Sequence, residues 1–193
     1  MRDHLLQLAE QESRLRHRLA LSGALLEGYH PEMRKIHEDN ARELELSIDD
    51  DGWPTAAEIG EAAAEAAFRI AFHAMSRPAF QRRCLTQMRA AANRGEIPAR
   101  HPAMLEDRIR VLEGRPQIYG TQLDWDDDGL LAPLPIADED AVDVRRAAVG
   151  LPPLAQSVAE AAALARATDE HPAAEWLHRQ HALVDFAREA GWR

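Results

Sequence analysis

Cysteine is almost absent from this chain of 193 residues, in which Cys84 is the only one. A single thiol allows no internal disulfide and excludes a zinc site built from several cysteines. Apolar runs are short as well, and none approaches the ~20 residues that a helix needs to cross a bilayer. The N-terminal stretch MRDHLLQLAEQESRLRHRL is charged throughout, unlike a secretory signal. We therefore expect a cytoplasmic protein with no membrane partner.

Clusters of basic residues are also lacking. The chain has 23 Lys and Arg against 33 Asp and Glu, which gives a formal net charge of -10. Nonspecific binding to nucleic acid depends on clustered Lys and Arg that neutralise phosphates, so we expect no nucleic-acid partner. A hydrophobic content of 46% in 193 residues is enough for the core of one domain. Nothing in the sequence indicates an oligomeric state.

Common catalytic and metal-binding motifs are missing, since the chain contains no GxSxG, P-loop, GxGxxG or HExxH motif. The segment DWDDDG, residues 124 to 129, matches the first half of a calcium-binding loop, but Pro135 stands where that loop needs a Glu. His30 and His37 share one predicted helix face and could join His73 in a three-histidine metal site. Because this spacing matches no known ligand helix, we expect no bound metal and no cofactor.

Proline, glycine and capping residues divide the chain into predicted helices. Pro31, Pro78 and Pro102 each suit the first turn of a helix. Thr55 and Glu58 form a capping box before another helix. The predicted helices cover residues 4–28, 31–46, 56–76, 78–93, 102–113, 138–149, 151–167 and 171–191. The predicted fold class is therefore mainly α, a single-domain bundle of seven or eight helices with one insertion.

The insertion is the stretch EGRPQIYGTQLDWDDDGLL, residues 113 to 131. QIYGTQLDW contains β-branched and aromatic residues, DDDG is typical of a turn, and LLAPLPI could return as an edge strand that tolerates proline. We expect a β-hairpin or an irregular segment between about 115 and 136. A long nonhelical segment in a helical domain is more often functional than a plain connection.

The motifs GYHPEM, GWP, FHAMSRPAFQRRCL, HPAMLEDRIRVLEGRPQIYGTQ and VDVRRAAVGLPPL occur in this order along the chain. Together they resemble a bacterial family catalogued only as a domain of unknown function. The resemblance covers about residues 14 to 156, and its most specific part is DRI followed by GxxQxYGTQ. It implies boundaries and no activity, so residues 157 to 193 are expected to be additional C-terminal helices.

His73 is the first candidate for a catalytic group. It shares a predicted helix face with Ala66, Ala67 and Ile70, so we expect its imidazole to be buried. It could serve as a general acid or base, because histidine titrates close to neutral pH. It could also be a core histidine bonded to a backbone carbonyl.

Gln81, Asp107 and Arg108 are polar residues on predicted apolar helix faces. Gln81 could orient a substrate, Asp107 could orient a catalytic histidine, and Arg108 could bind an anionic substrate group. In the structural alternative, Gln81 joins two helices and the two charged residues pair with other groups, because an isolated buried charge is costly. We predict that Arg108 is largely buried and ion-paired.

The insertion offers uncharged hydrogen-bonding groups at Gln117, Tyr119, Thr121 and Gln122. Strand alternation would place the first three on one face. They could bind a polar small molecule or peptide together with His30, or they could only join the hairpin to the helices. In the structural alternative for the histidines, His30 caps its helix and His37 is half exposed.

Two classes of function follow. The first is an enzyme of hydrolase or lyase type that acts on a polar small molecule or peptide by acid–base chemistry, with His73 as the proton carrier. The second is a noncatalytic binding, immunity or accessory module in which the same polar groups specify the fold. Short connections make neighbours of the three helices concerned. The residues expected to border one cavity are His73, Gln81, Asp107 and Gln117, with Tyr119 or Gln122 at the rim.

Overall fold

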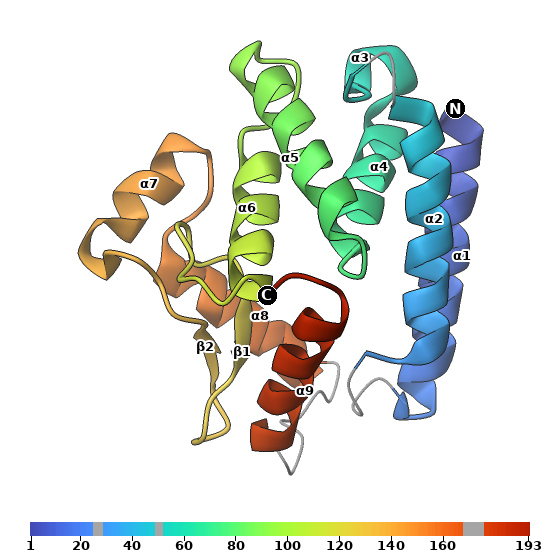
Figure 1. Ribbon diagram of the computed structural model, residues 1–193. Helices are drawn as coiled ribbons and strands as arrows, with labels where there is room; N and C mark the ends of the chain where they lie inside the picture. The colour runs from blue at the N-terminus through green and yellow to red at the C-terminus, as the bar shows by residue number, and fades with distance from the viewer. Residues whose placement is uncertain (25–28, 49–51, 168–175) are drawn as a thin grey trace. The chain divides into compact units, whose positions relative to one another are not determined.

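The structure, a computed structural model, describes residues 1–24, 29–48, 52–167 and 176–193 and is mainly helical (Figure 1). Nine α-helices and one β-hairpin lie in these residues, which confirms the predicted fold class. None of the described helices is long and apolar enough to cross a membrane. The chain divides into two compact units, Met1–Ile97 and Pro98–Arg193. That these units form a single domain stays a prediction.

The first unit contains the helices α1 (Arg2–Leu21), α2 (Pro31–Ile48), α3 (Ala56–Ile59), α4 (Glu61–His73) and α5 (Pro78–Asn93). Helices α1 and α2 form an antiparallel pair, both contact α4, and α5 packs against α4 (Figure 1). The starts of α2 and α5 at proline agree with the sequence prediction. Helix α1 ends at Leu21, with Ser22 as its C-cap, which corrects the predicted end near Gly28. The turn predicted for SIDDDGWP, residues 47–54, lies outside the described residues at 49–51.

A glycine divides the helix that was predicted for residues 56–76. The capping box forms as expected, since the backbone N–H and the hydroxyl of Thr55 both donate to Glu58 Oε2 at 2.9 Å. Gly60 then adopts φ 82° and ψ 154°, a left-handed φ that favours glycine. Helix α3 therefore ends before Gly60, and α4 begins after it and stops at His73 instead of Ser76.

The core of the first unit consists of apolar side chains from α1, α2, α4 and α5. Cys84 lies in this core with no exposed surface, as predicted, and burial raises the pKa of its thiol. Such a thiol stays protonated and packs as a small apolar group. Other members of the core are Leu5, Leu8, Leu44, Ala67, Ile70 and Met88.

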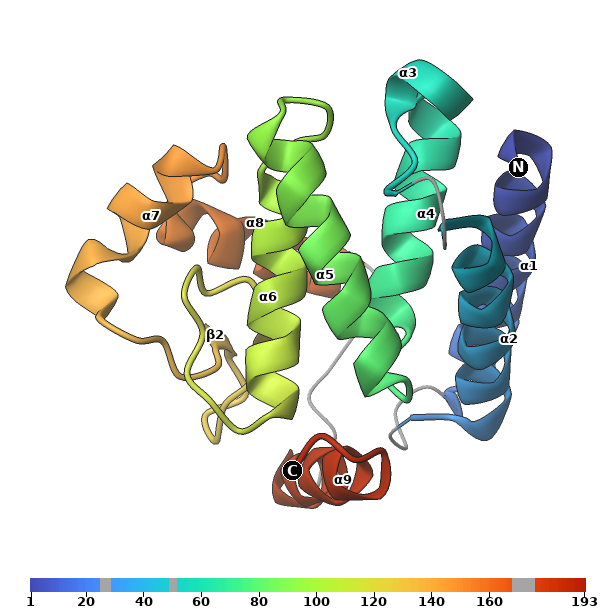
Figure 2. The same ribbon diagram turned by 45° about the horizontal axis from the view of Figure 1, so that its top comes forward.

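The second unit contains α6 (Arg100–Leu112), the strands β1 (Leu123–Trp125) and β2 (Leu131–Pro133), the 3-10 helix η2 (Glu139–Ala141), α7 (Val142–Ala148), α8 (Leu154–Ala167) and α9 (Trp176–Glu189). The two strands pair antiparallel, with Asp124 opposite Ala132, which confirms the predicted hairpin. Helix α8 contacts β2 and α7, and α9 contacts α6 (Figure 2). The predicted start of the last helix at residue 171 lies outside the described residues.

Candidate functional site

Glu12 is a buried acid on the apolar face of α1. It shares that face with Leu5, Leu8 and Leu19, and its side chain is 5% exposed. A charge in such a place needs partners, because its transfer out of water is costly. Two arginines supply them. Arg16 Nε of α1 lies 2.9 Å from Glu12 Oε1, and a terminal nitrogen of Arg69 of α4 lies 2.9 Å from Oε2.

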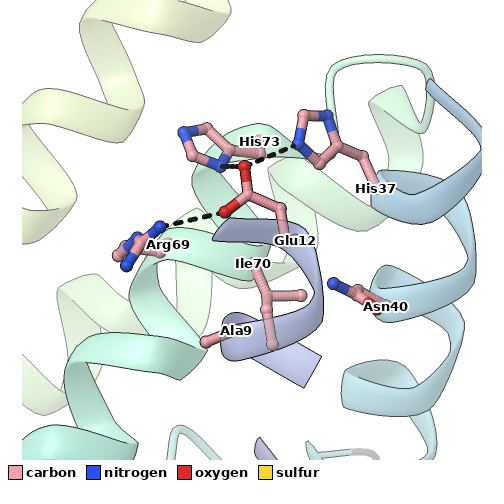
Figure 3. Close-up of a pocket in the computed structure, with 7 residues that line it drawn as sticks. All are labelled: Ala9, Glu12, His37, Asn40, Arg69, Ile70 and His73. Atoms are coloured by element: carbon pink, nitrogen blue, oxygen red, sulfur yellow. Dashed lines mark hydrogen bonds and ion pairs between the residues drawn. The ribbon is translucent and has the colours of Figure 1, made fainter. Parts of the chain in front are cut away.

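Two histidines approach the same carboxylate from other helices (Figure 3). His37 Nε2 of α2 lies 3.4 Å from Glu12 Oε1, and His73 Nδ1 of α4 lies 3.8 Å from the same oxygen. The centroids of the two imidazole rings are 4.9 Å apart. The hydroxyl of Tyr29 lies 2.7 Å from His37 Nδ1, which leaves Nε2 turned toward the carboxylate. Three helices thus bring one carboxylate and two imidazoles to a common point.

We name Glu12, Arg16, His37, Arg69 and His73 the Glu12 cluster. Four of these residues, all except Arg16, border a cavity of about 10 Å³ together with Ala9, Asn40 and Ile70 (Figure 3). This volume is about the room that one water molecule or one metal ion needs. The side chain of His37 is 4% exposed, whereas those of His73 and Arg69 are 22% and 42% exposed. Solvent therefore reaches the cluster on the side of His73 and Arg69.

The carboxyl of Glu12 has a pKa of about 2. Burial by itself would raise this pKa, but the hydrogen bond with His37 and the interactions with Arg16 outweigh it. The electrostatic interaction with His73 also lowers the pKa of Glu12. Glu12 is therefore ionised at neutral pH, although it is almost fully buried.

His73 is the last residue of α4, and Gln81 of α5 supports that helix end. Gln81 Nε2 donates to the carbonyls of Ala71 at 2.8 Å and Phe72 at 3.0 Å. Carbonyls in the last turn of a helix have no partner within the helix, so this amide satisfies them. The contact joins two helices, as in the structural alternative. A direct role of Gln81 in substrate binding stays a prediction.

The structure corrects two expectations for the histidines. His73 was expected to be buried and is only half-buried, because it lies at the end of its helix. His37 was expected to be half exposed and is buried, because it shares a face of α2 with Met33, Ala41 and Leu44. His30 caps α2, since its Nδ1 accepts the backbone N–H of Glu32 at 3.2 Å. Its predicted role in substrate binding stays a prediction.

Asp107 of α6, in the second unit, has no exposed surface. Its Oδ1 accepts the backbone N–H groups of Ile118 at 2.7 Å and Tyr119 at 3.1 Å. Its Oδ2 accepts both the backbone N–H and the hydroxyl of Thr121 at 3.0 Å. Asp107 thus anchors the loop 118–121 through both of its oxygens. These contacts account for its burial, and its predicted catalytic role stays a prediction.

The loop bound by Asp107 does not form the strand that was expected. Because its N–H groups point to a carboxylate, they cannot pair with a neighbouring strand, and β1 begins only at Leu123. The predicted alternation of Gln117, Tyr119 and Thr121 along one strand face is therefore wrong. Gln117 is fully buried and donates its amide to the carbonyls of Gln122 at 3.0 Å and Leu134 at 2.8 Å. It joins the loop to the hairpin, as in the structural alternative.

Two arginines of α7 bind the carbonyls of the same loop. Arg146, which is 2% exposed, donates to the carbonyls of Tyr119 and Pro152 at 2.6 Å. Arg145 donates to the carbonyl of Ile118 at 2.8 Å. We name Asp107, Arg145 and Arg146 the Asp107 anchor. Sequence analysis missed both arginines, although Arg146 lies one helical turn after the buried Val142.

Arg108 is half-buried rather than largely buried, which corrects the burial part of the prediction, and its ion pairing stays a prediction. Its Nε donates to Gln122 Oε1 at 3.0 Å. Successive residues of a helix point about 100° apart, so Arg108 cannot face the core in the way that Asp107 does. Tyr119 and Gln122 are half-buried in the same loop region. Substrate binding by Arg108, Tyr119 and Gln122 stays a prediction.

A family model matches most of the chain. It is described as a family of unknown function, DUF6624, and it covers residues 1–164. The chain belongs to this family. The match confirms the resemblance inferred from the motifs, encloses their range of about 14 to 156, and contains the whole Glu12 cluster. No curated protein and no solved structure matches the chain.

The predicted site residues of this DUF6624 protein fall into both units. His73 and Gln81 belong to the first unit, and Asp107 and Gln117 belong to the second. The placement of the units relative to one another is not determined, so a cavity shared by all four stays a prediction. Within the first unit, His73 meets Glu12 and His37. Sequence analysis did not select Glu12, although an acid in a row of buried leucines was a signal that could have found it.

Proposed function

We propose that this DUF6624 protein is an enzyme of hydrolase or lyase type that acts on a polar small molecule or peptide at the Glu12 cluster. The observation that supports this proposal is an ionised carboxylate and two imidazoles around a cavity of about 10 Å³. Carboxylate and imidazole groups within hydrogen-bond reach of a water can orient it and accept its proton. In this proposal the cavity holds that water.

The substrate itself would lie outside the cavity, because pockets for small molecules commonly have volumes of about 300 to 1,000 Å³. Among the residues that line the cavity, His73 and Arg69 contact the carboxylate and also reach solvent. Arg69 could hold an anionic or carbonyl group of the substrate through its remaining N–H donors. His37 is buried and oriented by Tyr29, so its role would be to position rather than to meet the substrate.

A noncatalytic binding or accessory module is the second candidate function. The observation that favours it is the Asp107 anchor, where buried charged groups are used by the chain's own backbone. If the Glu12 cluster serves only the fold in the same way, its residues would be needed for stability and not for turnover.

The two candidates can be distinguished with a panel of esters, phosphoesters, amides and short peptides. We expect the wild type to turn over at least one member, and Glu12→Gln and His73→Asn to abolish that turnover. His4→Asn is a matched control. His4 forms an exposed pair with Glu43 at a distance of 3.1 Å, and it is not among the residues that line the cavity. It should retain the activity of the wild type.

Binding can be followed without turnover through the imidazole NMR signals of His37 and His73 during titration with the same panel. Turnover that survives both cluster substitutions would refute the proposed site. No turnover together with unshifted imidazole signals would favour the noncatalytic module.

A further inference from the structure

We infer that the Glu12 cluster binds one divalent first-row transition ion of the Zn²⁺ type through Glu12 Oε1, His37 Nε2 and His73 Nδ1. The ligand atoms that these three residues offer all lie within 4.8 Å of one another. Two of the residues are buried and one is half-buried. This inference goes beyond the proposed function, because ion binding can be measured without any substrate.

The separations of the ligand atoms suit a tetrahedral site. Zinc lies about 2.0 to 2.2 Å from nitrogen and oxygen ligands, which places neighbouring ligand atoms about 3.3 to 3.6 Å apart. The oxygen of Glu12 is 3.4 Å from the nitrogen of His37 and 3.8 Å from that of His73. A bound ion would require His73 Nδ1 to move closer to the oxygen of Glu12, and all three ligand atoms lie within 4.8 Å of one another before it binds. His73 can provide this movement, because it lies at a helix end and is half-buried.

The chemistry of the ligands selects the class of ion. Two imidazoles and one carboxylate with a further open position are typical of catalytic zinc sites, whereas Mg²⁺ and Ca²⁺ prefer oxygen ligands alone. The cavity of about 10 Å³ offers room for one ion or one water. Tyr29 adds a further feature of metal sites. Its hydroxyl can accept the proton of His37 Nδ1, which leaves the lone pair of Nε2 free to bind a metal.

The two arginines of the cluster differ in how they would affect an ion. Arg69 bonds to Oε2 of Glu12, the oxygen that does not face the histidines, and ligating carboxylates commonly have such an outer partner. Arg16 bonds to Oε1, the ligating oxygen, so its charge repels a cation there. The side chain of Arg16 is 43% exposed and can turn toward solvent. Arg16 is therefore a competitor of the ion.

A bound ion of this class would also sharpen the proposed function. It lowers the pKa of a water that it binds to about 7, which would make that water the reagent for hydrolysis at neutral pH. The substrate would again meet this water on the side where His73 and Arg69 reach solvent.

The test is a titration of the chelator-treated full chain with Zn²⁺ by calorimetry and with Co²⁺ by visible absorption. We expect the wild type to bind one equivalent of each ion, with the intense Co²⁺ spectrum of a four-coordinate site. His37→Ala and His73→Ala should abolish stoichiometric binding, and Tyr29→Phe should weaken it about 10- to 100-fold. Arg16→Gln should bind at least as tightly as the wild type. His4→Ala, which alters the exposed His4–Glu43 pair, should bind like the wild type.

Circular dichroism of each chelator-treated variant shows whether it folds. If His37→Ala does not fold, because His37 is buried, the test depends on His73→Ala and Tyr29→Phe, whose positions are both half-buried. The inference is overturned by a wild type without stoichiometric binding, by full binding in His73→Ala, or by weaker binding in Arg16→Gln. Turnover that persists in excess chelator would show that the reaction needs no metal, which contradicts a role of the ion in catalysis and leaves the proposed function standing. One bound equivalent without turnover of any panel member would confirm the metal site and count against the enzyme.

Discussion

Glu12 and Asp107 are both carboxylates buried on a helix, yet their partners are of different kinds. Asp107 accepts hydrogen bonds from the backbone of loop 118–121 and from one hydroxyl of that loop. Glu12 is bound by side chains from three helices, all of which carry or can carry a charge. A cavity lies beside Glu12, and Asp107 is enclosed by the loop that it binds.

This difference indicates which buried charge is suited to chemistry. Both oxygens of Asp107 already accept hydrogen bonds from loop 118–121, and three of these four donors are backbone N–H groups that the loop itself holds in place. Side chains such as Arg16 and His73 can move while the helices stay packed, and the cavity beside them admits a water or an ion. Burial and charge alone therefore do not identify a site. The kind of group that binds the buried charge, and the presence of a cavity beside that charge, distinguish the two regions.

The largest effect on stability is expected for Asp107→Asn. The amide keeps the shape of the carboxylate but replaces one oxygen by an NH₂ group. If that group takes the place of Oδ2, the backbone N–H and the hydroxyl of Thr121 lose their acceptor. We expect the free energy of unfolding to fall by about 3 to 5 kcal/mol in urea denaturation. Asp127→Asn, in the exposed turn of the hairpin, should change it by less than about 0.5 kcal/mol. A loss below about 1 kcal/mol for Asp107→Asn would break the comparison, because Asp107 would then not be an anchor.

Arg146→Met should have the next largest effect. Methionine keeps much of the apolar stem but leaves the carbonyls of Tyr119 and Pro152 without their buried donor. We expect a loss of about 2 to 3 kcal/mol, together with faster hydrogen exchange of the amides in loop 118–121. The exposed Arg115→Met is the matched control and should leave that exchange unchanged. Unchanged exchange in Arg146→Met would show that Asp107 and Arg145 hold the loop without Arg146.

Arg108→Ala should have a smaller effect. Arg108 is half-buried, and its contact with Gln122 is a single hydrogen bond between side chains. We expect a loss of about 1 kcal/mol in the free energy of unfolding, measured in urea beside Asp107→Asn. A loss as large as that of its neighbour would mean that Arg108 belongs to the anchor. Comparing Asp107→Asn with Arg108→Ala therefore shows whether the Asp107 anchor includes Arg108.

The smallest effect on stability is expected for His73→Ala. Its ring is half-buried at a helix end, and its nitrogen lies 3.8 Å from Glu12, beyond a normal hydrogen bond. We expect the free energy of unfolding to change by less than about 1 kcal/mol while Zn²⁺ binding and turnover are lost. Calorimetry and urea denaturation on the same sample measure both. A loss of several kcal/mol would place His73 with the structural groups and remove the contrast with Asp107.

Local patterns in the sequence predicted most helices of this protein correctly. Pro31 and Pro78 start helices because their fixed φ suits the first turn, and Thr55 and Glu58 form the expected cap. The break at Gly60 was not predicted. A glycine inside a helical pattern costs only about 1 kcal/mol relative to alanine, so the sequence does not show whether the helix continues or breaks there.

The anchor in the second unit was predictable only in part. The apolar neighbours of Asp107 on α6 correctly indicated that its carboxylate is buried. Its partners could not be predicted, because backbone N–H groups occur at nearly every residue and leave no mark in the sequence. Arg146 shows the same limit, since its guanidinium bonds to carbonyls of loop 118–121, which is distant in sequence.

The sequence by itself determined most of the helices and the hairpin, since these depend on residues within a few turns of one another. The tertiary structure decided that Glu12, His37 and His73 meet beside one cavity. Each of them lies on a different helix, and the directions of their side chains are known only relative to their own helix axis. Which faces come together depends on the packing of all the side chains in the unit. For this physical reason the sequence marks Glu12 only as an acid on the apolar face of α1, and the packing of three helices makes it the centre of the candidate site.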